Sequence, residues 1–204
     1  MALTGAAGCG PILEAPPSAR DERPAQSQSS ALAQLADLKV APWASMAGYK
    51  RDRFADWASQ GDGCNTRDVV LKRDGTSVKV GDDCKITSGR WVSAYDGAAV
   101  TDPQELDIDH MVPLANAWRT GAAEWTAKDR AEFANDLARP QLLAVTASSN
   151  RSKGDQDPSQ WQPPNEQFWC TYAKDWVAVK AHWRLWVTEA EKDALTSMLE
   201  LCSD

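Results

Sequence analysis

The 204-residue sequence has only two histidines, and it contains no run of apolar residues long enough for a transmembrane helix. None of its five cysteines forms a CxxC pair, which disfavours a zinc finger. No internal repeat is present. The net charge of −7 argues against binding a polyanion through overall charge alone. An enzyme that meets phosphate through a metal ion and a few local cations remains compatible with this charge.

The length suits a single domain, and the N-terminal part predicts an exported protein. The opening "MALTGAAGCG" is typical of the end of a signal peptide. Within it, "AAGC" resembles a lipobox, in which Cys9 would carry a lipid anchor. Residues 10–30 are rich in Pro, Ser, Gln and charge, which predicts a disordered tether. We therefore assign residues 1–30 to a leader remnant and tether, and residues 31–204 to one secreted or extracellular domain.

Four of the cysteines fall into two well-separated pairs. We favour the disulfides Cys64–Cys84 and Cys170–Cys202, because each pair brackets one local segment. Each bridge would add about 3 kcal/mol by restricting the unfolded chain, and disulfides are typical of exported proteins. The other connectivities, and four reduced and buried cysteines, remain alternatives.

Hydrophobic periodicity and capping residues predict an α+β fold. Helices are expected over residues 30–40, 113–121, 126–138, 168–187 and 188–202, and strands over 84–102 with a turn at 96–97, 105–112 and 141–146. Residues 147–158 read as a helical turn or a polar loop. Residues 59–68, "SQGDGCNTRD", weakly resemble a calcium loop, but a turn held by Cys64 is favoured.

The stretch "ELDIDHMVPL" (105–114) places three ionisable side chains within four residues. On a strand, Asp107 and Asp109 share one face and His110 points to the other. A histidine near neutral pKa suits a general base, and a carboxylate suits a divalent cation. Bringing Asp109 and His110 to one phosphate requires a twist or bulge at the strand end. The alternative is a surface strand with a solvated acidic face.

A second polar stretch, "TASSNRSKGDQDP", follows the strand at 141–146. Asn150 offers an amide oxygen, and Mg²⁺ binds well to one or two protein oxygens while keeping several waters. Arg151 and Lys153 supply local positive charge for phosphate oxygens. The alternative for Asn150 is the common role of a turn or cap residue.

Together the two stretches resemble the HNH, or ββα-metal, endonucleases. The superfamily patterns "DxDHxxP" and "NR.K" appear here as "DIDHMVP" (107–113) and "NRSK" (150–153). A closer likeness, covering roughly residues 48–202, is to secreted HNH-family nucleases of bacteria. It includes "ELDIDHMVPL", "ANDLARPQLLAV" and "NRSKGDQDPSQWQPP". The resemblance implies a ββα-metal core with added helices and a small β-hairpin, stabilised by disulfides.

The resemblance also implies a role for each site residue. His110 is expected as the general base, Asp109 and Asn150 as metal ligands, Asp107 as an orienting group, Asn135 as a loop brace, and Arg151, Lys153 and Arg139 as phosphate-binding residues. The expected cofactor is a divalent metal, Mg²⁺ first and Mn²⁺ second. The expected substrate is DNA, single or double stranded and cut with little sequence preference, with RNA left open. A monomer that leaves 5′-phosphate ends is expected.

Two other functions are compatible with parts of the sequence. The ten tryptophans, the disulfides and the tether would suit a non-enzymatic cell-surface module that binds glycans. An HNH toxin with an immunity partner is the other. Trp118, Trp161 and Trp169 are candidates for stacking on bases, although core packing is favoured for each. His182 lies among apolar residues at helical spacing, which favours a packed or partly exposed helix residue over a ligand.

Overall fold

The computed structural model describes residues 26–203. Cys9, the expected leader remnant and residues 10–25 of the expected tether lie outside this range. The first helix begins earlier than expected, because α1 (Gln28–Asp37) is capped by Ser27, whose side chain accepts a hydrogen bond from the Ser30 amide. Over the described range, no helix combines the length and the apolar character needed to cross a bilayer.

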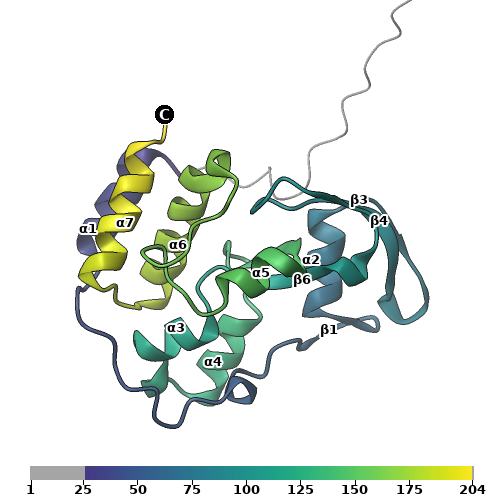
Figure 1. Cartoon of the computed structure of the whole chain (residues 1–204). Coiled ribbons are helices and arrows are strands. Elements are labelled where there is room, and N and C mark those ends of the chain that lie inside the picture. Colours follow the sequence, from purple (N-terminus) through teal and green to yellow (C-terminus); the bar gives the residue numbers. More distant parts are fainter. Residues whose placement is uncertain (1–25, 204) are drawn as a thin grey trace, which may run out of the picture.

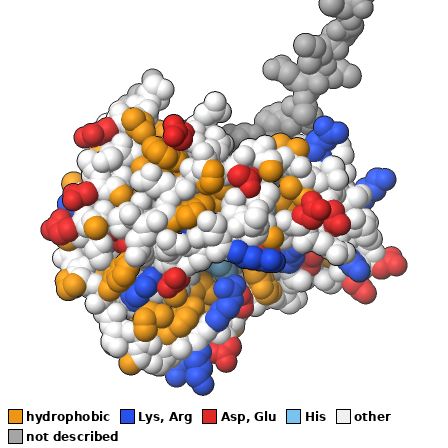
Figure 2. Space-filling model, viewed as in Figure 1, with side chains coloured by type: hydrophobic (Ala, Val, Ile, Leu, Met, Phe, Trp, Pro, Cys, Tyr) orange, Lys and Arg blue, Asp and Glu red, His pale blue; other side chains and the backbone are white. Residues whose placement is uncertain are grey.

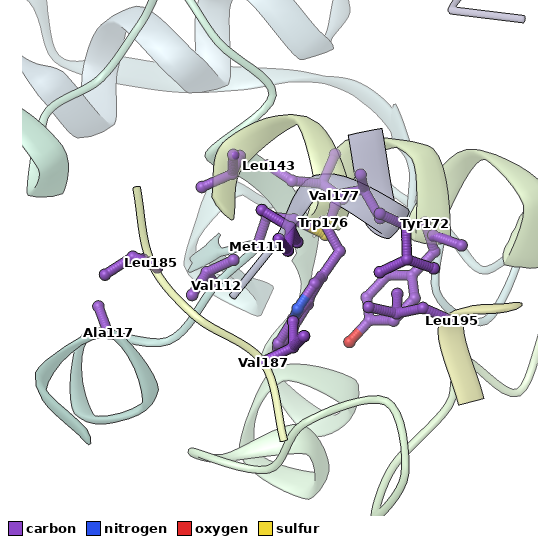
Figure 3. Close-up of a cluster of buried hydrophobic side chains, with 14 of the residues drawn as sticks. Met111, Val112, Ala117, Leu143, Tyr172, Trp176, Val177, Leu185, Val187 and Leu195 are labelled. Atoms are coloured by element: carbon purple, nitrogen blue, oxygen red, sulfur yellow. The ribbon is translucent and has the colours of Figure 1, made fainter. Parts of the chain in front are cut away.

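Three helices pack together on one side of the molecule (Figure 1). They are α1, α6 (Trp169–Trp183) and α7 (Glu189–Glu200). A capping box of Thr188 and Glu191 begins α7. The core beneath these helices also takes in residues that follow the central strand. Figure 3 shows Met111 and Val112 beside Trp176, a fully buried residue of α6.

The opposite side of the molecule holds two small sheets and one helix (Figure 1). The elements are β1 (Ser59–Gly61), β2 (Cys64–Asn65), α2 (Thr66–Asp74), β3 (Thr76–Val80), β4 (Ile86–Val92) and β5 (Ala99–Val100). Strands β1 and β2 form a hairpin, and the second sheet has the order β3-β4-β5. Asn65 and Asp68 form the capping box of α2. Residues 59–68 are therefore a hairpin and a helix start, as favoured over the calcium loop.

The central unit consists of two antiparallel strands and the helix that follows them. Strand β6 (Leu106–His110) pairs with β7 (Leu142–Thr146), so that His110 lies opposite Leu142. Helix α5 (Ala147–Lys153) follows β7 directly and lies against both strands. The sheet is buried on both faces, because Ile108 and Leu142 belong to one hydrophobic core and Leu143 belongs to the other.

The remaining regular structure connects these parts. Helices α3 (Leu114–Arg119) and α4 (Ala127–Ala134) lie between β6 and β7 in the chain. Short 3₁₀ helices cover Arg51–Phe54, Asp82–Cys84, Pro103–Glu105, Ala122–Glu124 and Glu166–Phe168. The α+β class is confirmed, and so are the disulfides Cys64–Cys84 and Cys170–Cys202.

Candidate active site

A polar pocket of about 260 Å³ opens at the C-terminal end of β6. Its lining combines the end of β6 and the start of α3 with parts of α5 and of the segment after α1. The lining residues are Tyr49, Arg51, Ile108, Asp109, His110, Pro113, Leu114, Ala115, Asn150, Arg151, Gly154 and Asp155. Figure 2 shows Lys and Arg side chains bordering a hollow on this face, with histidine surface beside them. The structure thus brings the two predicted stretches together.

His110 is the last residue of β6 and is only 5% exposed. Its Nε2 lies 3.0 Å from the carbonyl oxygen of Ala134 at the end of α4. A carbonyl only accepts hydrogen bonds, so Nε2 carries the proton and Nδ1 of the neutral ring keeps its lone pair. Burial lowers the pKa of His110 from 6.5 to about 4, against the opposing effect of the Ala134 bond. The ring is therefore neutral, and one nitrogen can accept a proton.

Asp109 is 4% exposed and is held by a buried lysine. Lys153 Nζ donates to both carboxylate oxygens, at 2.9 and 2.7 Å, and to the His110 carbonyl at 2.8 Å. The Tyr95 hydroxyl donates to Asp109 Oδ2 as well. Burial raises the pKa of Asp109 and the Lys153 ammonium opposes that rise. The Asp109 side chain is thus anchored to α5 through Lys153.

The position of Lys153 corrects our expectation that it holds phosphate. Its side chain is fully buried, and its ammonium already has three acceptors, which is the full donor capacity of a lysine. Lys153 lies only two residues after exposed Arg151, but its long alkyl chain extends inward and brings the ammonium to Asp109. Lys153 therefore contributes to the scaffold beneath the pocket and does not reach its opening.

Asn150 and Asp107 are joined by a hydrogen bond between α5 and β6. The Asn150 amide nitrogen donates to Asp107 Oδ2 at 3.1 Å, and Asn150 also lines the pocket. The amide oxygen is the atom of this side chain that can act as an acceptor. Asp107 was expected to orient His110 or a metal-bound water, but the His110 ring is oriented by the Ala134 carbonyl. Asp107 instead fixes the rotation of the Asn150 amide, because strand alternation turns it toward α5.

Two arginines provide exposed positive charge at the pocket. Arg151 is 77% exposed and lies 3.8 Å from Asp107, and Arg51 is 59% exposed and pairs with Asp56 at 2.8 Å. Arg51 was not predicted, because residues 49–58 carry no periodic pattern that places them near β6. Arg139, predicted as a phosphate contact, is absent from the described lining and pairs with Asp136.

Two amide side chains brace the walls of the site. Asn135 accepts from the Ala58 amide and donates to the Ala55 carbonyl, so it ties residues 55–58 to the end of α4. That segment places Trp57 5.9 Å from the His110 ring. Gln141, which sequence reasoning missed, is fully buried and exchanges two hydrogen bonds with the Val112 backbone. It fixes the chain just beyond His110.

The oxygen donors suit a cation that keeps most of its water. The described residues contain no group of three or more His, Cys, Asp and Glu side chains that could hold a metal ion. Asn150 and Asp109 both line the pocket, and Asp109 Oδ1, which accepts from Lys153, has the lone-pair capacity for a further bond. One carboxylate and one amide match the sparse protein ligation that Mg²⁺ prefers.

The other aromatic and histidine candidates lie elsewhere. Trp118 is 3% exposed and belongs to the helical core, as favoured. Trp161 and Trp169 are partly buried and pack against the same core. His182 is an exposed residue of α6 and does not line the pocket.

Comparison with known proteins places these observations in a family. The family described as "GmrSD restriction endonucleases, C-terminal domain" matches residues 66–198, which include all of β6, β7 and α5. A curated protein of Arthroderma benhamiae, named "Uncharacterized secreted protein", is 52% identical over 176 residues, covering 86% of each chain. No solved structure matches.

Proposed function

Because the chain belongs to the family of GmrSD restriction endonuclease C-terminal domains, we propose that it is an exported HNH-type endonuclease. Its reaction is the hydrolysis of DNA phosphodiesters with little sequence preference, and RNA is a second possible substrate. The single observation that carries the proposal is the environment of His110. Its ring is neutral and anchored through one nitrogen, and His110 lines the same pocket as Asn150 and two exposed arginines.

In this mechanism Nδ1 of His110 takes a proton from the attacking water. The Ala134 carbonyl keeps the ring in the tautomer that accepts the proton, and it stabilises the imidazolium that forms. A phosphate bound by Arg51 and Arg151 brings negative charge close to the ring. That charge raises the pKa of His110 toward neutrality during the reaction. Binding of substrate would thus make the buried histidine a stronger base.

Asp109 and Asn150 would hold a divalent cation, Mg²⁺ first and Mn²⁺ second. The bound ion would supply positive charge for the phosphate and for the leaving 3′-oxygen. Asp107 would act through Asn150, because its bond to the amide nitrogen leaves the amide oxygen as the atom that would hold the ion. Arg51 and Arg151 orient the phosphate, and in-line attack by water would leave 5′-phosphate ends.

Export is supported by the disulfides of this chain and by the name of a relative. Two disulfides join Cys64 to Cys84 and Cys170 to Cys202, and such bonds persist in oxidising compartments. The curated relative is itself named as secreted. Lipidation of Cys9 would add an anchor and is tested by mass spectrometry of the mature protein.

The test is a cleavage assay on DNA and RNA, with and without EDTA. The wild type should degrade both or only DNA, and EDTA should stop it. His110→Ala should lower the rate by about 10²-fold or more, because a general base contributes on that order. His182→Ala is the matched control. Cleavage by His110→Ala at the wild-type rate, with an unchanged circular dichroism spectrum, would contradict the assignment.

A second variant tests the metal ligands. Asn150→Ala should move the midpoint of the Mg²⁺ titration to higher concentration while leaving the unfolding temperature close to that of the wild type. Asn150 is only partly buried, so its loss should leave the fold intact. An unchanged Mg²⁺ titration would remove Asn150 from the metal site.

A further inference from the structure

A second and larger cavity, of about 660 Å³, lies beside the catalytic pocket. Its walls come from the segment after α1, the segment after α5 and the start of α7. The lining residues are Val40, Ala41, Pro42, Trp43, Asp157, Ser159, Gln160, Thr188, Glu189 and Ala190. The Ala41 amide donates to the Val187 carbonyl, the Val187 amide donates to the Lys39 carbonyl, and the Trp186 indole donates to the Pro42 carbonyl. The cavity is therefore part of the folded structure.

One side chain connects this cavity to the catalytic pocket. The Arg119 guanidinium lies 4.2 Å from the centre of the Trp43 ring. The same group donates to the Asp155 carbonyl at 2.8 Å and lies 3.2 Å from the Asp155 carboxylate. Trp43 lines the cavity and Asp155 lines the catalytic pocket. A ligand that stacks on Trp43 would therefore be separated from the proposed phosphate site by the Arg119 guanidinium and Asp155.

Trp43 has the exposure of a binding residue. It is 37% exposed, while the tryptophans of the core, such as Trp91, Trp118 and Trp176, are at most 3% exposed. The Arg119 side chain is only 13% exposed and is fixed by Asp155, so it holds the indole in one orientation. A pre-oriented indole at the edge of an apolar cavity is suited to stacking against a flat ring.

Asp157, which lines the same cavity, has a carboxylate oxygen that lacks a hydrogen-bond donor within the described part of the chain. It is 1% exposed, and its Oδ1 accepts from the Ser159 amide and hydroxyl. Its Oδ2 is buried and has no hydrogen-bond partner among the described residues. A buried carboxylate oxygen without a donor is unfavourable, so an incoming donor is favoured. With Glu189 also in the lining, the cavity disfavours a phosphate and favours a neutral group bearing N–H.

We propose that this cavity binds the base of a nucleotide adjacent to the phosphate held in the catalytic pocket. The base stacks on Trp43 and presents an N–H group toward Asp157, while its phosphate stays with Arg51 and Arg151. Every nucleobase has a flat face and at least one N–H donor, which is engaged in base pairing in a duplex. The subsite therefore favours strands with unpaired, unstacked bases and has little preference for sequence. This inference rests on the proposed nuclease function.

The test compares two single-stranded oligonucleotides of equal length in the presence of Mg²⁺. One carries ordinary bases and the other carries tetrahydrofuran abasic units on the same sugar–phosphate backbone. The wild type should cleave the base-bearing strand with a kcat/KM about 5- to 100-fold higher, as expected for one stacked base. Trp43→Ala should lose this preference by slowing only the base-bearing strand, and Trp43→Phe should retain most of it.

Two further variants separate binding from folding. Met46→Ala is the matched control, because Met46 lies in the same segment with the same 37% exposure and does not line the cavity. Ala190→Leu fills the cavity while leaving Trp43 in place, and it should lower kcat/KM on the base-bearing strand alone. Equal loss on both strands for either cavity variant would overturn the inference.

The remaining outcomes distinguish this inference from the proposed function. If the wild type cleaves neither strand, the nuclease function itself fails. If it cleaves both strands equally, the function stands and the base subsite fails. If cellohexaose raises the unfolding temperature of the wild type, and Trp43→Ala abolishes that effect while the strand preference is unchanged, the cavity binds sugars and the inference is wrong.

Discussion

Replacing Lys153 with methionine should destabilise the protein far more than removing its exposed neighbour Arg151. Methionine keeps most of the side-chain volume but removes the ammonium that bonds both oxygens of Asp109 and the His110 carbonyl. Asp109 would then be a buried carboxylate that keeps its hydrogen bond from the Tyr95 hydroxyl but has lost its counter-charge. Breaking one side of a buried ion pair costs about 3–5 kcal/mol, which is a large part of a typical stability of about 5–15 kcal/mol.

The assay is urea unfolding of both variants, followed by tryptophan fluorescence. Lys153→Met should lower the free energy of unfolding by about 3–5 kcal/mol, equivalent to roughly 6–20 °C in unfolding temperature for a chain of this size. Arg151→Met should change it by less than about 0.5 kcal/mol, because Arg151 is 77% exposed. The same Arg151 variant should bind DNA more weakly.

The double variant Lys153→Met with Asp109→Asn isolates the cause. A neutral amide removes the unpaired buried charge, so the double variant should be more stable than Lys153→Met alone. If Lys153→Met were as stable as the wild type and weaker only in binding DNA, the ammonium would face the substrate. That result would refute both the burial argument and our correction of its role.

Three further predictions follow from single features. In metal-free buffer the ring signals of His110 should titrate near pH 4 by NMR. Because the pKa of His110 is lower in the folded state than the unfolded value of 6.5, the free energy of unfolding should be constant above pH 6.5 and should fall by about 3 kcal/mol between pH 6.5 and pH 4. His110→Gln should lack this dependence on pH. Replacing Cys170 and Cys202 by serine should lower the free energy of unfolding by about 3–4 kcal/mol for a loop closed over 32 residues, measured by urea unfolding without reductant. Thr188→Ala should cost about 1 kcal/mol in the same assay, since it removes the bond to the Glu191 amide.

The elements that local signals specify were predictable, and the others were not. Helices α4 and α7 were expected because Thr126 and Thr188 are good capping residues, and both form capping boxes in the structure. Helix α2 was missed because most of its nine residues are polar or charged and only three are buried. Strand β3 was missed because its residues are mostly exposed and it exists through pairing with β4.

The site shows the same division between local and long-range information. His110, Asp109 and Asn150 stand in recognisable motifs, and the structure places all three at one pocket. Lys153 looked like a surface cation, because nothing in the sequence shows that Asp109, 44 residues earlier, lies beneath it. Arg51 lies in a segment without periodicity and reaches the pocket through tertiary packing.

The charge balance beneath the pocket leads to a last prediction about the metal. Asp109 is compensated by Lys153 and Asp107 faces Arg151, so the protein alone offers a cation little net negative charge. The substrate phosphate supplies the missing charge, and a cation should therefore bind weakly to the free protein and more tightly with DNA present. Calorimetric titration of Mg²⁺ into His110→Ala, with and without an oligonucleotide, measures this coupling.

Linkage requires the effect to be reciprocal, so Mg²⁺ should strengthen oligonucleotide binding by the same factor. Arg151→Met should increase the affinity of the free protein for Mg²⁺, because it removes a cation close to Asp107 without disturbing the core. Equal Mg²⁺ affinity with and without oligonucleotide would show that the protein oxygens alone define the metal site. In that case Asp109 would have to release Lys153 when the ion binds, and the buried ion pair would be a property of the metal-free protein only.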